Sequence, residues 1–267
     1  MKIFLKLFIT GLVFSLVLFT ISAIALAGLY VYLSPQLPSI VGLSDVRLHV
    51  PLRIYSSDGS LLGEFGEKRR SPKSLDEFPL RMRRAFLSAE DDRFFEHPGV
   101  DYQGILRAVI NLISTGERGQ GGSTITMQLA RNFYLSSEKT YIRKLSEIFL
   151  ALKIERELSK EKILELYLNK IYLGNRSYGV AAAAQVYYGA TLDELTLAQT
   201  AMIAGLPKAP SRYNPIINPE RAITRRDYVL SRMHELDYIC LLYTSDAADE
   251  YNPVYISVVA VSLKKIF

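Results

Sequence analysis

The chain has 267 residues, enough for one large domain or two small ones, and 49% of them are hydrophobic. Its formal net charge of +5 suits an anionic partner, such as a phosphate-bearing substrate or a lipid surface. The Lys and Arg residues are spread along the chain without a basic tract interleaved with aromatic residues, which argues against nucleic-acid binding. Cys240 is the only cysteine, so the composition excludes an internal disulfide framework and a cysteine zinc site.

The first predicted element is an apolar segment, residues 7–33, which contains no charged residue. It is long enough to cross a hydrocarbon layer, which needs roughly 20 helical residues. Lys2 and Lys6 precede it, so the positive-inside rule predicts that residues 1–6 are cytoplasmic and that the chain beyond Pro35 is extracytoplasmic. A cleaved signal peptide is the alternative, because residues 25–27 (Ala-Leu-Ala) are typical of a cleavage site, but the length favours an uncleaved anchor.

Residues 34–78 are predicted to lead from the anchor to the main domain. Two short extended runs, residues 52–55 and 61–65, flank a turn signal in which Gly59 can supply a positive φ. We expect a small β-hairpin near the membrane.

From Pro79 onward the apolar residues recur with a helical period, so residues 79–239 are predicted to form a mainly α domain. Helices are predicted over residues 80–95, 123–133, 141–158, 160–173, 178–188, 194–206 and 219–236. The glycine-rich run 114–122 is predicted to be a mobile loop, because it has little apolar content.

The first cluster of chemically capable residues is Glu-Asp-Asp-Arg-Phe-Phe-Glu-His-Pro-Gly, residues 90–99. On a helix, Glu90 would share an apolar face with Phe86 and Phe94. A carboxylate on such a face loses hydration, so its pKa rises toward the range useful for proton transfer. The alternative is a solvated acidic helix end, and His97 by itself favours a structural role.

The second cluster is Gly-Gly-Ser-Thr-Ile-Thr-Met-Gln-Leu-Ala-Arg-Asn, residues 121–132. Glycines that lead into a helix start offer free backbone N–H groups to an anion. An ordinary Ser or Thr N-cap explains the same pattern without a ligand. A P-loop is excluded, because no Gly-Lys-Ser or Gly-Lys-Thr ends the glycine run.

The third cluster is Arg-Lys-Leu-Ser-Glu, residues 143–147. Glu147 lies off the apolar stripe of its predicted helix and one turn from Arg143 and Lys144. A weak surface ion pair is one interpretation, and a row of cations that faces a pyrophosphate is the other.

These three clusters, in this order, resemble the family 51 glycosyltransferases of class A penicillin-binding proteins and monofunctional peptidoglycan polymerases. The resemblance covers about residues 1–239 and is closest to the N-terminal part of bifunctional proteins of Gram-negative type. It implies a lysozyme-like helical fold with a membrane-associated subdomain, anchored in the bacterial inner membrane with the catalytic domain on the periplasmic side.

The resemblance also implies the reaction, in which lipid II is polymerised into glycan strands and undecaprenyl pyrophosphate is released. Glu90 would be the general base toward the acceptor 4-hydroxyl, and Glu147 would act on the donor side. The residues implied to bind substrate are Asp91, Phe94, His97, Ser123, Thr124, Gln128, Arg131, Asn132, Lys139, Arg143 and Lys144. A divalent cation, Mg or Mn, is the one cofactor implied, at the donor pyrophosphate. Membrane lipids and other cell-wall synthesis proteins are the expected further partners.

Two other functions remain open on the residues alone. A lysozyme-like hydrolase or lytic transglycosylase would also place a glutamate on a helix beside a glycan cleft. An inactive membrane-anchored scaffold that binds glycan is the non-enzymatic alternative. The Gly-Gly-Ser-Thr and Arg-Lys-x-x-Glu clusters argue against the hydrolase, and the presence of both glutamates argues against the scaffold.

The resemblance ends near Ile239, and residues 240–267 are typical of a translated sequencing adapter rather than of native protein. Three Ser-x-x-Lys matches occur in the chain, at Ser136, Ser159 and Ser262, without the partner motifs of a penicillin-binding transpeptidase. We therefore expect no transpeptidase domain in this chain and no function in residues 240–267.

Overall fold

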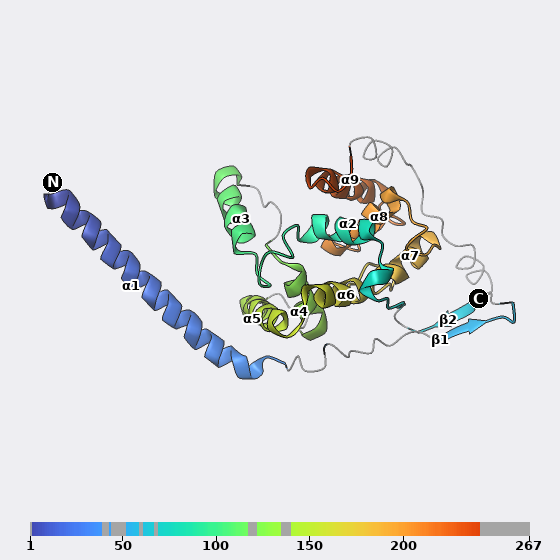
Figure 1. Cartoon of the computed structure of the whole chain (residues 1–267), viewed down its shortest axis with the longest axis horizontal. Coiled ribbons are helices and arrows are strands. Elements are labelled where there is room, and N and C mark those ends of the chain that lie inside the picture. Colours follow the sequence, from blue (N-terminus) through green and yellow to red (C-terminus); the bar gives the residue numbers. More distant parts are fainter. Residues whose placement is uncertain are drawn as a thin grey trace.

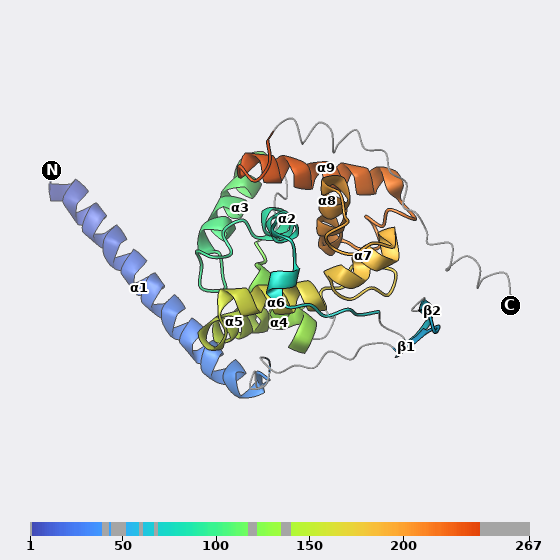
Figure 2. The ribbon, with the colours of Figure 1, turned by 45° about the vertical axis from the view of Figure 1, so that its right-hand side comes forward.

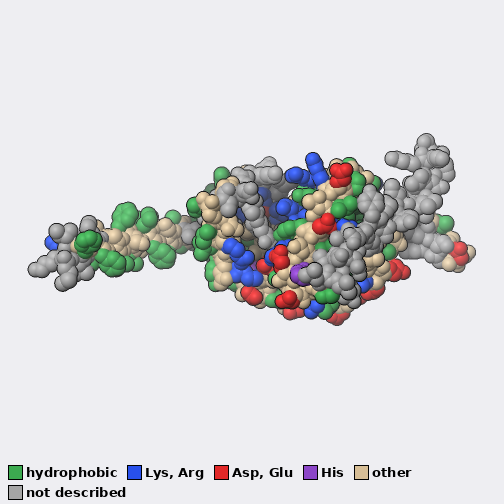
Figure 3. All heavy atoms as spheres, turned by 90° about the horizontal axis from the view of Figure 1, so that it is seen from above, with side chains coloured by type: hydrophobic (Ala, Val, Ile, Leu, Met, Phe, Trp, Pro, Cys, Tyr) green, Lys and Arg blue, Asp and Glu red, His purple; other side chains and the backbone are tan. Residues whose placement is uncertain are grey.

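The computed structural model describes residues 2–38, 43, 52–58, 61–66, 69–116, 122–134 and 140–240. Its first element is the helix α1 (Lys2–Leu33), which projects as a long arm from the body of the molecule (Figure 1). Figure 3 shows hydrophobic side chains along this arm, whereas the body carries many charged ones. Residues 8–33 have a mean hydropathy of 2.5, and none of their most apolar window is buried in the protein. By length and composition, α1 can cross a membrane.

Two short strands, β1 (Leu52–Tyr55) and β2 (Leu61–Phe65), follow and pair antiparallel. A position near the membrane is not supported, because both ribbon views place these strands at the opposite end of the body from α1 (Figures 1 and 2). Contacts with the α6–α7 connection explain this position: Arg176 donates a hydrogen bond to the Gly66 carbonyl, and Arg69 forms a bridge with Ser177.

The body of the molecule is helical, as predicted. Its helices are α2 (Leu80–Glu90), α3 (Tyr102–Thr115), α4 (Ile125–Tyr134), α5 (Tyr141–Glu157), α6 (Lys160–Lys170), α7 (Val180–Tyr188), α8 (Leu197–Gly205) and α9 (Pro219–Glu235). Short 3-10 turns, η1 (Ser34–Gln36), η2 (Leu75–Glu77) and η3 (Leu206–Lys208), follow α1, precede α2 and follow α8.

Two helix boundaries matter for the site. The predicted helix over residues 80–95 is too long, because the backbone leaves the helical region at Asp91, with φ −163° and ψ 81°. The helix α3 occupies a segment for which no helix was predicted. It includes Ser114 and Thr115 of the predicted loop, and residues 117–121 of that loop lie outside the described residues.

The helices pack in two groups. In the first, α2 contacts α8 and α9, and in the second, α4 contacts α5 and α6. Figure 2 shows the two groups on opposite sides of the body, with α9 and α2 above and α5, α4 and α6 below. Fully buried Phe86, Tyr167 and Tyr187 contribute to the core, and the rings of Phe86 and Tyr167 pack edge to face. Glu90 therefore ends a helix of the first group, and Glu147 lies on a helix of the second.

Candidate active site

Glu90 lies at the end of α2, and its side chain is only 11% exposed, so its carboxylate is largely removed from solvent. Its Oε2 accepts a hydrogen bond of 2.8 Å from the Gln128 amide, and its Oε1 lies 3.4 Å from the Arg225 guanidinium. Burial raises the pKa of Glu90, while Gln128 and Arg225 oppose that shift. A carboxylate with a raised pKa suits proton transfer near neutral pH, as predicted from the sequence.

The Gln128 amide lies between the Glu90 carboxylate and the Tyr167 hydroxyl. The Tyr167 hydroxyl donates to Gln128 Oε1 at 3.3 Å, which leaves the amide nitrogen to face Glu90. Burial and the neighbouring Glu90 hold the pKa of Tyr167 well above its ordinary value, so the hydroxyl keeps the proton that it donates to Gln128. Tyr167 thus positions Glu90 through Gln128.

Helix α9 places two arginines beside acids at the end of α2 and in the turn that follows it. Arg225 and Arg232 are seven residues apart and lie on one face of α9, where Arg225 approaches Glu90 and Arg232 pairs with Asp92 at 2.7 Å. Arg225 is buried, donates to the Gly205 carbonyl at 3.3 Å and stacks over the Tyr228 ring at 4.4 Å. Neither arginine was predicted from the sequence.

Asp91 and His97 form a buried pair that shapes the turn after α2. His97 Nε2 lies 2.9 Å from Asp91 Oδ1, and Asp91 Oδ2 accepts from the Ile125 backbone N–H at 3.0 Å. Asp91 lines the pocket, but both of its oxygens already have partners. Phe94 is fully buried and His97 is 5% exposed, so both side chains pack inside the protein. Their predicted contact with substrate stays a prediction.

The start of α4 is capped by protein groups. The Thr124 hydroxyl accepts from Met127 N at 3.2 Å and donates to the Gly99 carbonyl at 2.6 Å. Asp91 takes the Ile125 N–H, so two of the first N–H groups of α4 are not available to an anion. The ordinary N-cap interpretation therefore fits this helix start better than an anion site.

Glu147 is a buried acid between two cations. It is 1% exposed, and its two oxygens pair with Arg143 and with Lys144, the latter at 3.0 Å. The surface ion pair considered from the sequence is therefore wrong. Lys144 Nζ also donates to the Ser123 hydroxyl at 2.5 Å. Burial, together with the charges of Arg131 and Arg143, lowers the pKa of Lys144 to about 8.

The remaining predicted residues divide into three cases. Arg131 is half-buried on α4, and its charge acts on both Glu90 and Lys144. The amide nitrogen of Asn132 is buried and has no hydrogen-bond partner among the described residues. Lys139 lies outside the described residues.

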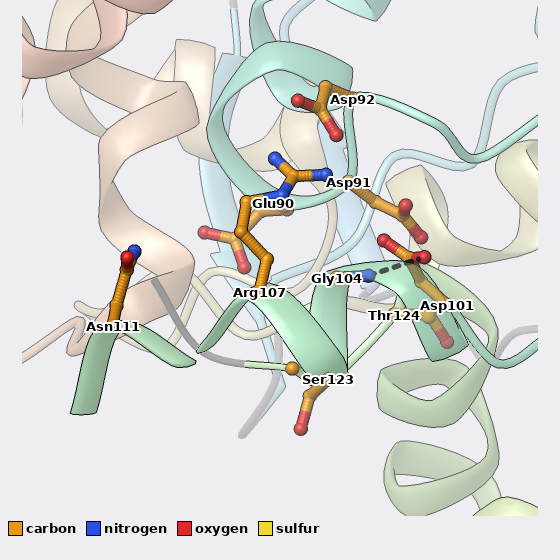
Figure 4. A pocket seen from close by; sticks show the side chains of 10 residues that line it. Glu90, Asp91, Asp92, Asp101, Gly104, Arg107, Asn111, Ser123 and Thr124 are labelled. Atoms are coloured by element: carbon orange, nitrogen blue, oxygen red, sulfur yellow. Dashed lines mark hydrogen bonds between the residues drawn. The ribbon is translucent and has the colours of Figure 1, made fainter. Parts of the chain in front are cut away.

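A pocket opens beside Glu90. Its lining comes from the turn after α2, from the start of α4 and from α3, and includes Asp92, Asp101, Gly122 and Ser123. Helix α3 contributes Arg107 and Asn111, and Figure 4 shows Arg107 extending into the pocket on the side of Glu90. Arg107 and Asn111 were not predicted from the sequence, and neither was their helix. Leu106, Ile110 and Ile113 at helical spacing, and Asp101 ahead of them as an N-cap, were the signals.

Comparison with known families gives a match over most of this body. The family model described as Transglycosylase matches residues 58–234, which include all three clusters and α9 up to His234. The chain belongs to the transglycosylase family. Within this transglycosylase chain, the matched range contains Glu90, Gln128, Glu147 and Arg225.

Similar proteins include penicillin-binding protein 1A of Escherichia coli, 58% identical over 79% of this chain and 25% of that protein. Penicillin-binding protein 1A of Pseudomonas aeruginosa is 55% identical over 81% of this chain and 26% of that protein. This transglycosylase chain spans about a quarter of the length of these relatives. A crystal structure of penicillin-binding protein 1A from Haemophilus influenzae is 33% identical with a TM-score of 0.45, over 83% of this chain and 24% of that one.

Proposed function

We propose that this chain is a peptidoglycan glycosyltransferase that polymerises lipid II into glycan strands and releases undecaprenyl pyrophosphate. The observation that carries the proposal is the buried carboxylate of Glu90, held by Gln128 and Arg225 at the edge of a pocket and carrying a raised pKa. The family match and the identity to penicillin-binding proteins 1A support the same reaction.

In this reaction Glu90 takes the proton of the acceptor 4-hydroxyl as that oxygen attacks the anomeric carbon of the donor. The new C–O bond forms while the bond from that carbon to the pyrophosphate oxygen breaks, and the leaving group keeps the electron pair. Because the acceptor approaches opposite to the leaving group, the configuration inverts. General base catalysis of this kind contributes about 10²–10⁴ in rate.

Neutralisation of the leaving pyrophosphate is assigned to the cations on α4 and α5. Arg143 and Lys144 share the single negative charge of Glu147, and Arg131 adds a further positive charge nearby. The group therefore retains net positive charge in a half-buried environment, where a charge acts more strongly than in water. Glu147 fixes the two cations in place, which is a positioning role.

The expected divalent cation stays a prediction, and the residues present fit it poorly. Both carboxylate oxygens of Glu147 are occupied by cationic side chains. Among the residues that the structure describes, no group of three potential metal ligands occurs. Arginine and lysine side chains are therefore the groups assigned to neutralise the pyrophosphate charge.

We further propose that α1 anchors the domain in the cytoplasmic membrane with the body on the periplasmic side and a lysozyme-like arrangement of helices. The hydropathy of α1 and its exposed surface support the anchor. Confinement of enzyme and lipid substrate to one surface would raise their effective concentration.

The test incubates the detergent-solubilised chain separately with labelled lipid II and with purified, already polymerised peptidoglycan. We expect glycan ladders from lipid II and no soluble muropeptides from the polymer. Release of muropeptides without ladders would favour the hydrolase, and binding of lipid II without any product would favour the scaffold.

A further inference from the structure

A groove outside the active site lies between the end of α1 and the helix α5. Its volume is about 430 Å³, and its walls are formed by Tyr30, Ser34 and Leu37 on one side and by residues 149–157 of α5 on the other. Tyr30 and Phe149 close one part of it, with their rings edge to face and their centroids 5.2 Å apart.

The α5 wall combines apolar and charged residues on one helix face. Phe149, Leu152, Lys153, Arg156 and Glu157 recur at helical spacing, so they share the face turned toward α1. Lys153, Arg156 and Glu157 are exposed, and no ion pair holds these three residues within the described part of the chain. Lys153 and Arg156 are positive and Glu157 is negative, so the net charge of this wall is about +1.

The position of the groove along α1 defines its environment. The apolar segment that can cross a membrane ends at Leu33, and Tyr30 and Tyr32 lie in its last turn, where aromatic residues mark the membrane–water interface. Ser34 and Pro35 begin the polar continuation. If α1 spans the membrane, as proposed above, the groove lies at the level of the lipid headgroups.

We propose that this groove binds one anionic phospholipid of the surrounding membrane. Its phosphate lies between Lys153 and Arg156, its acyl chains follow Tyr30 and Phe149 toward the apolar part of α1, and Glu157 accepts a hydrogen bond from a headgroup hydroxyl. A singly charged phosphodiester matches the charge of the wall. The cations assigned to the substrate pyrophosphate, Arg143 and Lys144, lie on the preceding turns of α5 and do not line this groove.

The lipid would tie α1 to α5, the helix that carries Glu147 and its two cations. The inference rests on the proposed membrane anchor, and it deepens the proposed function by giving the enzyme a structural lipid distinct from its substrate.

The test extracts the full 267-residue chain from nanodiscs that contain phosphatidylglycerol, phosphatidylethanolamine and phosphatidylcholine in equal amounts, and native mass spectrometry counts the lipids retained. We expect phosphatidylglycerol to be retained by the wild type. Retention should fall about tenfold or more in the double variant Lys153→Gln, Arg156→Gln, because each cation at a membrane surface contributes about 1 kcal/mol. Leu152→Trp should lower retention by filling the groove without a change of charge.

Arg221→Gln is the matched control, because Arg221 is an exposed cation on α9, away from the groove, and should retain lipid like the wild type. Equal retention in the wild type and the double variant would overturn the inference, as would equal retention of phosphatidylcholine or displacement of the lipid by inorganic phosphate.

A second measurement separates this inference from the proposed function. The same variants, solubilised in detergent, are assayed for synthesis of glycan from lipid II. Ladders from a wild type that retains no phosphatidylglycerol would overturn the lipid site alone. Retained phosphatidylglycerol in a folded wild type that makes no ladders would overturn the glycosyltransferase and leave the lipid site supported.

Discussion

At the residue scale, Glu90 is governed by partners from distant parts of the chain. Gln128 comes from α4 and Arg225 from α9, and each faces one oxygen of the carboxylate. Burial raises the pKa of Glu90, and these partners limit the rise. The balance between them determines the pH at which the base becomes available, because only the ionised carboxylate can accept a proton.

Replacement of Arg225 by glutamine should move the acid limb of the pH profile. The rate increases as pH rises through the pKa of Glu90, and removal of a nearby cation raises that pKa further. The acid limb of kcat/KM should therefore shift to higher pH, as measured with labelled lipid II across a pH series. Arg221→Gln, on the same helix, should leave the limb in place, and an unshifted limb in Arg225→Gln would contradict this assignment.

The alkaline limb of the pH profile of kcat/KM is assigned to Lys144. Its pKa is lowered to about 8, so the ammonium loses a proton as pH rises above that value. The neutral amine no longer attracts the pyrophosphate. We expect kcat/KM to fall above about pH 8 and the fall to disappear in Lys144→Arg, because a guanidinium stays charged. Lys162→Arg on α6 is the control that should keep the fall. Persistence of the fall in Lys144→Arg would assign it to another group.

At the element scale, the start of α4 is joined to the turn that follows α2. The Thr124 hydroxyl links Met127 N to the Gly99 carbonyl, and Asp91 links Ile125 N to His97. These contacts fix the turn that directly follows Glu90. The capping of α4 therefore contributes to the position of the Glu90 carboxylate.

Thr124→Val should destabilise the fold by about 1–3 kcal/mol, because it removes the cap and leaves two buried backbone groups without a partner. Thr and Val have the same number of heavy side-chain atoms, so no large cavity adds to the cost. Thr124→Ser keeps the hydroxyl and should lose much less. Urea unfolding in detergent measures both, and equal stability of Thr124→Val and wild type would show that the cap contributes nothing.

Sequence patterns predicted the helices that bury an apolar face, because burial imposes the helical period on the residues. They overextended α2, since Phe94 continues the apolar spacing although a turn, rather than a helix, buries it. They missed α3, whose Leu106, Ile110 and Ile113 are exposed in this structure despite their helical spacing.

Within the candidate site, local patterns indicated Glu90 and the cations around Glu147, because these residues lie in compact clusters, whereas Gln128 was named only through the family resemblance, as a substrate-binding residue. Arg225 could not be predicted in the same way. An arginine on an amphipathic helix is ordinarily solvated, and only the packing of α9 against α2 brings this one to Glu90. The burial of Glu147 was likewise a tertiary effect.

At the scale of the whole molecule, α1 and the body have different surfaces. The arm is apolar from Phe8 to Leu33, whereas the body carries many charged side chains (Figure 3). The double variant Leu16→Arg, Phe19→Arg should abolish insertion, because each central charge costs about 2.5–3.5 kcal/mol on the insertion scale. We expect the wild type in the pellet after alkaline carbonate extraction and the variant in the soluble fraction.

Leu16→Ala with Phe19→Ala is the matched control and should remain in the pellet. The mass of the membrane-bound chain tests the signal-peptide alternative at the same time. A mature chain that begins near residue 28 and leaves the membrane on extraction would contradict the anchor.

The most direct test of the central claim compares Glu90→Gln with Glu96→Gln in the synthesis of glycan from lipid II. Glu96 lies in the same turn but is exposed, so its replacement controls for the loss of one negative charge. If Glu90 is the base, Glu90→Gln loses about 10²–10⁴ in kcat/KM while Glu96→Gln stays near the wild type. Glycan ladders of equal yield from Glu90→Gln and the wild type would remove Glu90 from the reaction.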